Sequence, residues 1–171
     1  MNRHIRMNKQ ITRMKQLIIA LFTTILFLSV GTETKAQSYK NAIGVRLGAC
    51  NGLTFKTWLA ESRAVDLSLN YIYGSEYSTY CLTGLYEVHM NTNILPHLLW
   101  YYGGGGSLGS KRHKNVDNGK LFISIDGVIG LDYKFEKEPI NLSLDWKPAV
   151  QFAPLALFDG GGLNLSIRYT F

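Results

Sequence analysis

Runs of strict period-two alternation predict an all-β chain whose eight antiparallel strands close into an up-and-down barrel. Beyond its first 37 residues the 171-residue sequence shows almost no helical periodicity. No connection between successive strands is long enough to hold a crossover helix, so neighbouring strands should be antiparallel. Because the strand count is even, the last strand can pair with the first and close the sheet.

The predicted strands cover residues 42–50, 52–59, 64–73, about 78–91, 98–106, 120–135, 140–147 and 161–171. Asn51-Gly52 is a strong signal for a tight hairpin between the first two strands. Pro96 cannot donate to a ladder and therefore suits the connection before the fifth strand. The longest predicted connection is Ser107–Gly119, and residues 155–160 are expected to loop into the last strand.

The amino terminus is typical of a cleaved signal peptide over residues 1–37, which leaves residues 38–171 for the barrel. Five basic residues between Arg3 and Lys15 precede an uncharged run of fourteen residues, Leu17 to Val30. A membrane-spanning helix needs ~20 apolar residues, whereas the apolar core of a signal peptide has ~7–15. Cleavage is expected on either side of Gln37, and an uncleaved anchor is the alternative.

Removal of this segment changes the charge of the chain. Residues 1–37 carry six of the 18 Lys and Arg residues and one of the 12 Asp and Glu residues, so the net charge falls from +6 to about +1. The basic character therefore belongs mostly to the export signal and gives no indication of nucleic-acid binding.

Charged residues within the predicted strands all lie on the face opposite the aliphatic residues. They are five cations and five anions: Arg46, Lys56, Lys134, Lys147 and Arg168, with Asp66, Glu87, Asp126, Asp132 and Asp145. An eight-stranded barrel has an interior that its own side chains fill, and an unpaired charge there would be costly. The balance predicts a lumen plugged by a network of these ten paired charges.

The outward aliphatic face predicts a transmembrane barrel in the outer membrane, surrounded by lipid and lipopolysaccharide. Several strands reach the ~9–11 residues that cross the hydrocarbon layer. Aromatic residues end the aliphatic stripes at residues 71 and 73, 133 and 135, and 169 and 171, as interfacial girdles do. A soluble exported barrel that binds an apolar ligand would alternate in the same way with its faces inverted, and it is one alternative.

Several pieces of the chain resemble a family of small outer-membrane β-barrel proteins common in the Bacteroidota, which are eight-stranded and OmpX/OmpA-like. These pieces are Thr83–Glu87, Trp100–Gly103, Gly127–Tyr133, Ile140–Pro148 and Leu165–Phe171. The Lys-Ala-Gln ending of the signal segment is similar to Bacteroidota signal peptides. The resemblance implies the barrel fold and no chemistry. It also implies that Tyr169 and Phe171 form the insertion signal, read by the barrel-insertion machinery after delivery by periplasmic chaperones.

Both ends of the mature chain should face the periplasm, together with the connections at 60–63, 92–97 and 136–139. The other connections should face outward. One of them holds the basic cluster 111–114, which is either a solvated loop or a contact for lipopolysaccharide phosphates.

Few residues suggest chemistry. The glycine string 104–109 lacks the following helix that a dinucleotide site needs, so it is expected to ease a strand into a loop. Ser68, Glu87 and His89 could serve a lipid-modifying hydrolase, but their parity points inward, where a structural network is expected. Cys50 and Cys81 are predicted as two thiols rather than a disulfide. No spacing indicates a metal site or a cofactor.

The predicted role is therefore non-catalytic: envelope structure, or surface interaction through the outward loops. A monomer is expected. The hydrolase and the soluble ligand-binding barrel are the alternatives.

Overall fold

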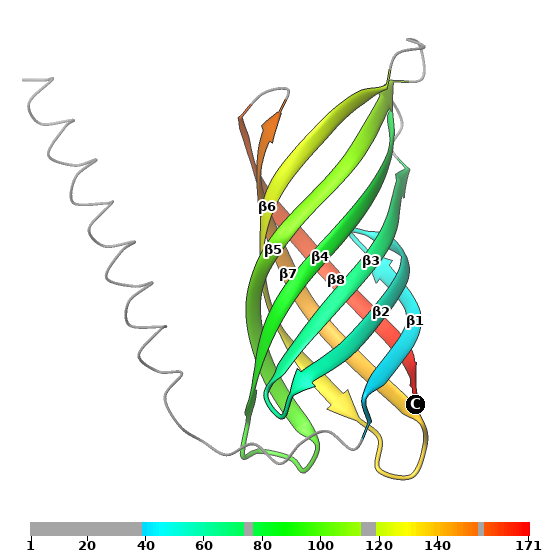
Figure 1. Ribbon diagram of the computed structural model, residues 1–171, viewed down its shortest axis with the longest axis vertical. Coiled ribbons are helices and arrows are strands. Elements are labelled where there is room, and N and C mark those ends of the chain that lie inside the picture. The colour runs from blue at the N-terminus through cyan, green and yellow to red at the C-terminus, as the bar shows by residue number, and fades with distance from the viewer. Residues whose placement is uncertain (1–38, 74–76, 114–118, 154–155) are drawn as a thin grey trace, which may run out of the picture. The chain divides into compact units, whose positions relative to one another are not determined.

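The computed structural model describes residues 39–73, 77–113, 119–153 and 156–171. These residues form eight strands, which are β1 (Asn41–Gly48), β2 (Asn51–Ala60), β3 (Arg63–Tyr73), β4 (Tyr77–Asn91), β5 (Leu98–His113), β6 (Lys120–Lys134), β7 (Ile140–Ala153) and β8 (Leu157–Thr170). Each strand pairs antiparallel with the next, and β8 pairs with β1 (Figure 1). The prediction of a closed, eight-stranded antiparallel barrel is confirmed.

No helix among the described residues is long and apolar enough to cross a lipid bilayer. The predicted signal peptide lies outside the described residues, because residues 1–38 are not among them.

The barrel has two ends that differ in their connections. The turn end carries the start of β1, the end of β8 and the connections at 61–62, 92–97 and 135–139. The loop end carries the connection at 49–50, the end of β3 and start of β4, the end of β5 and start of β6, and the end of β7 and start of β8. At the turn end the backbone N–H of Asn41 donates to the carbonyl of Phe171, and that of Phe171 donates to the carbonyl of Asn41, at 2.9 and 2.8 Å. The two ends of the described chain therefore close the barrel together.

The first hairpin turns two residues earlier than predicted. Ala49 and Cys50 separate β1 from β2, and Asn51-Gly52 belongs to β2. Gly48 has a φ of 130°, which favours glycine. Asn51 accepts the Gly48 backbone N–H on its side-chain oxygen at 3.1 Å. Asn51 thus stabilises the turn from its far side rather than lying within it.

Three predicted strand ends were wrong. β5 continues past its glycines to His113, so residues 107–113 are strand and not loop. Its ladder with β6 extends to Lys111 and its ladder with β4 extends to His113, and this pairing holds the glycine-rich stretch extended. β7 continues through Pro148 to Ala153, and β8 begins at Leu157. Pro148 lies at a register shift between Lys147 and Ala149, where its missing N–H is tolerated.

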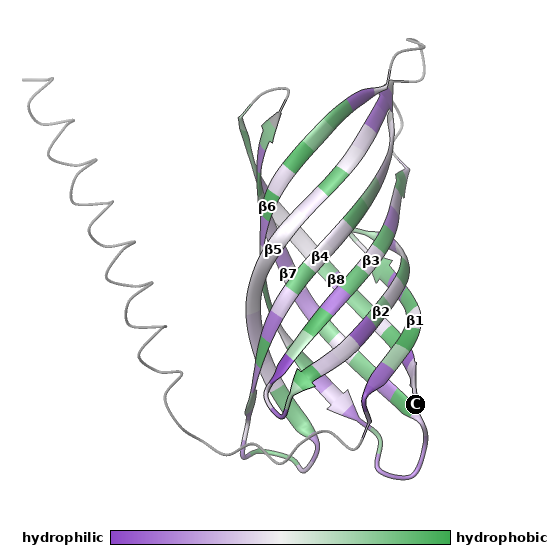
Figure 2. Ribbon diagram, in the orientation of Figure 1, coloured by the Kyte–Doolittle hydropathy of each residue, from purple (hydrophilic) through white to green (hydrophobic). Residues whose placement is uncertain are grey.

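Hydrophilic and hydrophobic residues alternate along much of the sheet (Figure 2), and the two kinds lie on opposite faces. On the outside, the side chains of Ile129, Leu144 and Ile167 are 48%, 46% and 41% exposed. On the inside, Asp145 and Arg168 are each 1% exposed. The aliphatic residues thus face outward and the ionic residues fill the interior, so the alternative of a barrel with an apolar interior finds no such interior in the described residues.

Candidate functional site

The lumen holds all ten charged residues that the sequence places on the inner face. Nine are buried and Lys147 is half-buried, the buried nine being Arg46, Lys56, Asp66, Glu87, Asp126, Asp132, Lys134, Asp145 and Arg168. Within the described residues, four of the cations form ion pairs with all five carboxylates. Lys134 instead donates to the backbone carbonyls of Phe135 and Glu138 at the turn end.

Arg168 of β8 forms the most extensively bonded pair. Its guanidinium donates to the carboxylate of Asp66 and, at 2.7 Å, to the hydroxyl of Ser143. Its Nε donates to the Thr54 hydroxyl at 3.2 Å, and that hydroxyl donates to Asp66 at 2.9 Å. These bonds link β2, β3, β7 and β8 across the lumen. A buried charge is tolerated when its hydrogen-bonding capacity is filled in this way.

Lys56 of β2 lies at the centre of a second cluster. Its ammonium is 2.6 Å from an oxygen of Asp132 and 2.9 Å from an oxygen of Glu87. The same nitrogen is 3.1 Å from Nε2 of His89 and 4.7 Å from the ring centroid of Tyr101. Lys56 has three donors, and two carboxylates and one imidazole nitrogen surround it. The cluster joins strands β2, β4, β5 and β6.

Arg46 of β1 pairs with Asp145 of β7. Asp145 also accepts a hydrogen bond from the Tyr101 hydroxyl at 3.0 Å and one from the side-chain amide of Asn164 at 3.2 Å. Tyr101 is fully buried and therefore connects this pair to the Lys56 cluster. Asn141 donates to Asp132 and accepts a hydrogen bond from Arg168, so the three groups of ion pairs form one connected network.

Four aromatic rings extend this network toward the turn end. The ring centroids of Tyr39 and Trp58 are 6.0 Å apart, those of Trp58 and His89 are 4.5 Å apart, and those of His89 and Tyr101 are 4.9 Å apart. We call these four residues the aromatic column. Together with the ion pairs it fills the turn-end half of the lumen with side chains.

The alternation of the sequence did not predict this column. Tyr39 precedes the first predicted strand, and Tyr101 lies in the piece Trp100–Gly103, which indicated only the family resemblance. Strand parity could have found Tyr101, which lies on the inner face of its strand. The next two residues on that face, Gly103 and Gly105, have no space for a side chain.

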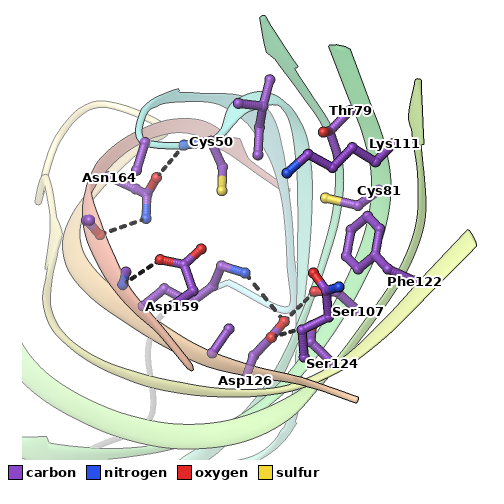
Figure 3. Close-up of a pocket in the computed structure, with 17 residues that line it drawn as sticks. Cys50, Thr79, Cys81, Ser107, Lys111, Phe122, Ser124, Asp126, Asp159 and Asn164 are labelled. Atoms are coloured by element: carbon purple, nitrogen blue, oxygen red, sulfur yellow. Dashed lines mark hydrogen bonds and ion pairs between the residues drawn. The ribbon is translucent and has the colours of Figure 1, made fainter. Parts of the chain in front are cut away.

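The loop-end half of the lumen is more open. A cavity of about 270 Å³ lies there, and Lys147 and Asp126 form an ion pair of 3.2 Å in its wall (Figure 3). Asp126 also accepts hydrogen bonds from Ser107 and Ser124. Cys50 lines the same cavity, and burial raises the pKa of its thiol. The buried side chains of the turn-end half close this cavity toward the turn end. We call the cavity the loop-end cup.

The three residues of the hydrolase alternative do not come together, because Ser68 lies apart from Glu87 and His89. Ser68 accepts a hydrogen bond from Asn70 at 2.9 Å, while His89 contacts Lys56. His89 Nε2 is 3.6 Å from Glu87, and all three predicted residues are buried in the lumen rather than near the outer surface. Among the described residues no hydrogen bond joins Ser68 to His89. In the part of the chain that the structure describes, Ser68 and His89 therefore do not form a nucleophile–base pair.

The basic cluster lies partly in a strand. Lys111, Arg112 and His113 end β5, and Lys114 lies outside the described residues. Lys111 lines the loop-end cavity, while Arg112 follows it on the opposite face of the strand. The expectation that this cluster is a loop was wrong for these three residues, because the ladder with β4 reaches His113.

A solved structure shares this fold. The amino-terminal β-barrel domain of Pseudomonas aeruginosa OprF is 13% identical, with a TM-score of 0.60 over 77% of this chain and 95% of that one. Neisserial surface protein A is also 13% identical, with a TM-score of 0.49 over 77% of this chain and 93% of that one. No protein-family model and no curated protein matches the chain. At this identity the likeness concerns the fold.

Proposed function

We propose that the protein is a non-catalytic, integral β-barrel of the bacterial outer membrane, with a role in envelope structure or in surface interaction. The observation that carries the proposal is the outward aliphatic surface, which includes Ile43, Leu67, Ile125, Leu144 and Ile167, each more than a third exposed. In water such a continuous apolar surface would promote aggregation. In a bilayer it is the surface that lipid tails cover.

Aromatic residues at both ends of this surface support the proposal. At the loop end the rings of Tyr71 and Tyr80 are 4.7 Å apart. At the turn end lie three outward aromatic pairs, Trp100 with Tyr102, Tyr133 with Phe135 and Tyr169 with Phe171. Trp and Tyr favour the level of the lipid headgroups, where one part of the ring is apolar and the other is hydrated. The two groups mark the two proposed interfaces.

The closed lumen favours a role other than a general pore. The aromatic column and the ion pairs leave the turn-end half filled, so solutes would meet a wall of side chains below the loop-end cup. The surface available to partners is therefore the loop end, where Arg112 and Lys120 are exposed. Phosphate groups of lipopolysaccharide are a partner of suitable charge for these cations.

Export and assembly complete the proposal. Residues 1–37 act as the signal peptide, and Tyr169 and Phe171 serve as the insertion signal for the barrel-insertion machinery after delivery by periplasmic chaperones. Both residues are more than half exposed on the outer surface of β8 and its end. The turn end faces the periplasm, and the protein acts as a monomer without nucleic acid. We also propose membership of the Bacteroidota barrel family, on the sequence pieces that resemble it.

Membrane extraction tests the localisation. The envelope fraction of expressing cells is washed with high salt, with alkaline carbonate and with detergent. We expect the protein to stay with the membranes in the salt and carbonate washes and to dissolve in detergent. In gels it should migrate faster in unheated samples than in heated ones. Release by salt into the soluble fraction would refute the proposal.

A further inference from the structure

The two cysteines lie on the same cavity, although they are far apart in the chain. Cys50 comes from the turn between β1 and β2, and Cys81 comes from β4. Figure 3 shows both sulfur atoms directed into the loop-end cup. Both thiols are free and buried. The cup therefore presents two sulfur donors to whatever occupies it.

The surrounding structure holds both cysteines in place. The backbone N–H of Cys50 donates to the side-chain oxygen of Asn164 at 2.9 Å, and the Asn164 amide donates to Asp145 in the lumen. Gly109 lies opposite Cys81 in the β4–β5 ladder. A Cβ atom on Gly109 would lie 2.7 Å from the Cβ of Cys81, so the glycine provides the space that the cysteine needs.

The cup also supplies a positive charge beside the thiols. The Lys147 ammonium has three N–H donors, and Asp126 accepts one of them at 3.2 Å. Asp126 is itself bonded to Ser107 and Ser124. Lys147, Cys50 and Cys81 line the same cavity. A cation in such a cavity favours the thiolate over the thiol.

We propose that Cys50 and Cys81 together bind one soft monovalent metal ion, of the Cu(I) or Ag(I) class, as a two-coordinate bis-thiolate. Thiolates are the ligands that select such ions. Each thiol transfers its proton to water when its sulfur binds the metal. One monovalent ion and two thiolates carry a net charge of −1, and the lining of the cavity holds two cations, Lys111 and Lys147, together with two carboxylates, Asp126 and Asp159.

The ligand count argues against zinc. A structural zinc site needs four ligands, and among the described residues no group of three or more His, Cys, Asp or Glu side chains could hold a metal. A site with two sulfur donors suits an ion that accepts two ligands. The competing possibility is a disulfide, which an exported protein can form.

Titration of the full-length folded protein with Ag⁺, in detergent and a chloride-free buffer, tests the proposal. We expect one Ag⁺ per chain, detected by ultraviolet absorption from thiolate-to-metal charge transfer. Cys50→Ser and Cys81→Ser should each weaken binding at least 100-fold. Thr79→Ala, which alters the same cavity without removing sulfur, should bind as the unmodified protein does, and Zn²⁺ in excess should not compete.

Three results would overturn the proposal. They are binding of two Ag⁺ ions per chain with each single variant binding one, retention of full affinity in either cysteine variant, and the absence of titratable thiols in the unfolded protein because a disulfide has formed. Circular dichroism and the heat-dependent gel shift check that each variant is folded. Cys50→Ala and Cys81→Ala provide a second pair of variants should a serine prevent folding.

Discussion

The guanidinium of Arg168 on β8 donates to the carboxylate of Asp66 on β3, although 102 positions separate them in the chain. Neither strand is the other's neighbour in the sheet. The pair crosses the lumen, and it can form only once the barrel has closed. Its contribution to stability therefore depends on the complete fold.

Removal of one partner of this pair should be strongly destabilising. We expect Arg168→Met to lower the free energy of unfolding by about 3–5 kcal/mol, because the Asp66 carboxylate would stay buried without its cation. The double variant Asp66→Leu with Arg168→Met should recover most of this loss, since neither charge remains. Urea unfolding in lipid vesicles measures both.

Arg112→Met provides the control for that experiment, because Arg112 is exposed at the end of β5. It should change the unfolding free energy by less than about 0.5 kcal/mol. If Arg168→Met proved equally mild, Arg168 and Asp66 would not form a buried pair.

A charge introduced on the outer surface should lower the free energy of unfolding more at the middle of the barrel than near its end. Ile125 and Leu121 both lie on β6 and are 61% and 70% exposed, but Leu121 is near the loop end. In vesicles we expect Ile125→Lys to cost about 2–4 kcal/mol and Leu121→Lys about 0–1 kcal/mol. Equal costs at the two positions would contradict a membrane around the barrel.

The aromatic column should contribute more to the free energy of unfolding than aromatic residues on the outer surface do. Trp58 is 9% exposed within the lumen, and Trp146 is 44% exposed on the outer surface. We expect Trp58→Ala to cost about 3–5 kcal/mol through the cavity that it leaves, and Trp146→Ala to cost clearly less. Denaturant unfolding of the two variants side by side makes the comparison, and a reversed order would contradict the filled turn-end half.

The filled lumen predicts that the protein does not conduct ions steadily. In planar bilayers the purified barrel should insert without a stepwise rise in current, because the aromatic column and the ion pairs block the passage. A known porin inserted under the same conditions is the control. Reproducible unitary conductance steps from the purified barrel would show that the lumen opens.

The Cys50 thiol should react slowly at neutral pH. Burial raises its pKa, so less of it is thiolate than in an exposed cysteine. In a Cys81→Ser background, alkylation of Cys50 should be slower than that of free cysteine, and its rate should still rise at a pH where free cysteine has reached its plateau. The prediction would be contradicted if the rate reached its plateau at the same pH as that of free cysteine, or at a lower pH.

Local alternation was enough to predict much of the fold. The period of two places Asp132 and Leu131 on opposite faces without reference to any other strand. The even number of strands and the lack of crossover segments predict the pairing of β8 with β1. Strand ends were harder, because glycines in β5 and Pro148 in β7 are locally unfavourable in strands, and pairing with neighbouring strands overrides that preference.

The sequence by itself determined which residues share a face of each strand and that the charges on the polar face balance, because both properties depend only on strand parity and composition. Only the tertiary structure decided that Arg168 bonds to Asp66, that Lys56 lies between Glu87 and Asp132, and that Cys50 and Cys81 share one cavity. Partners across a lumen come from strands that are not neighbours. Their heights match only through the tilt and register of the closed barrel, which no single strand encodes.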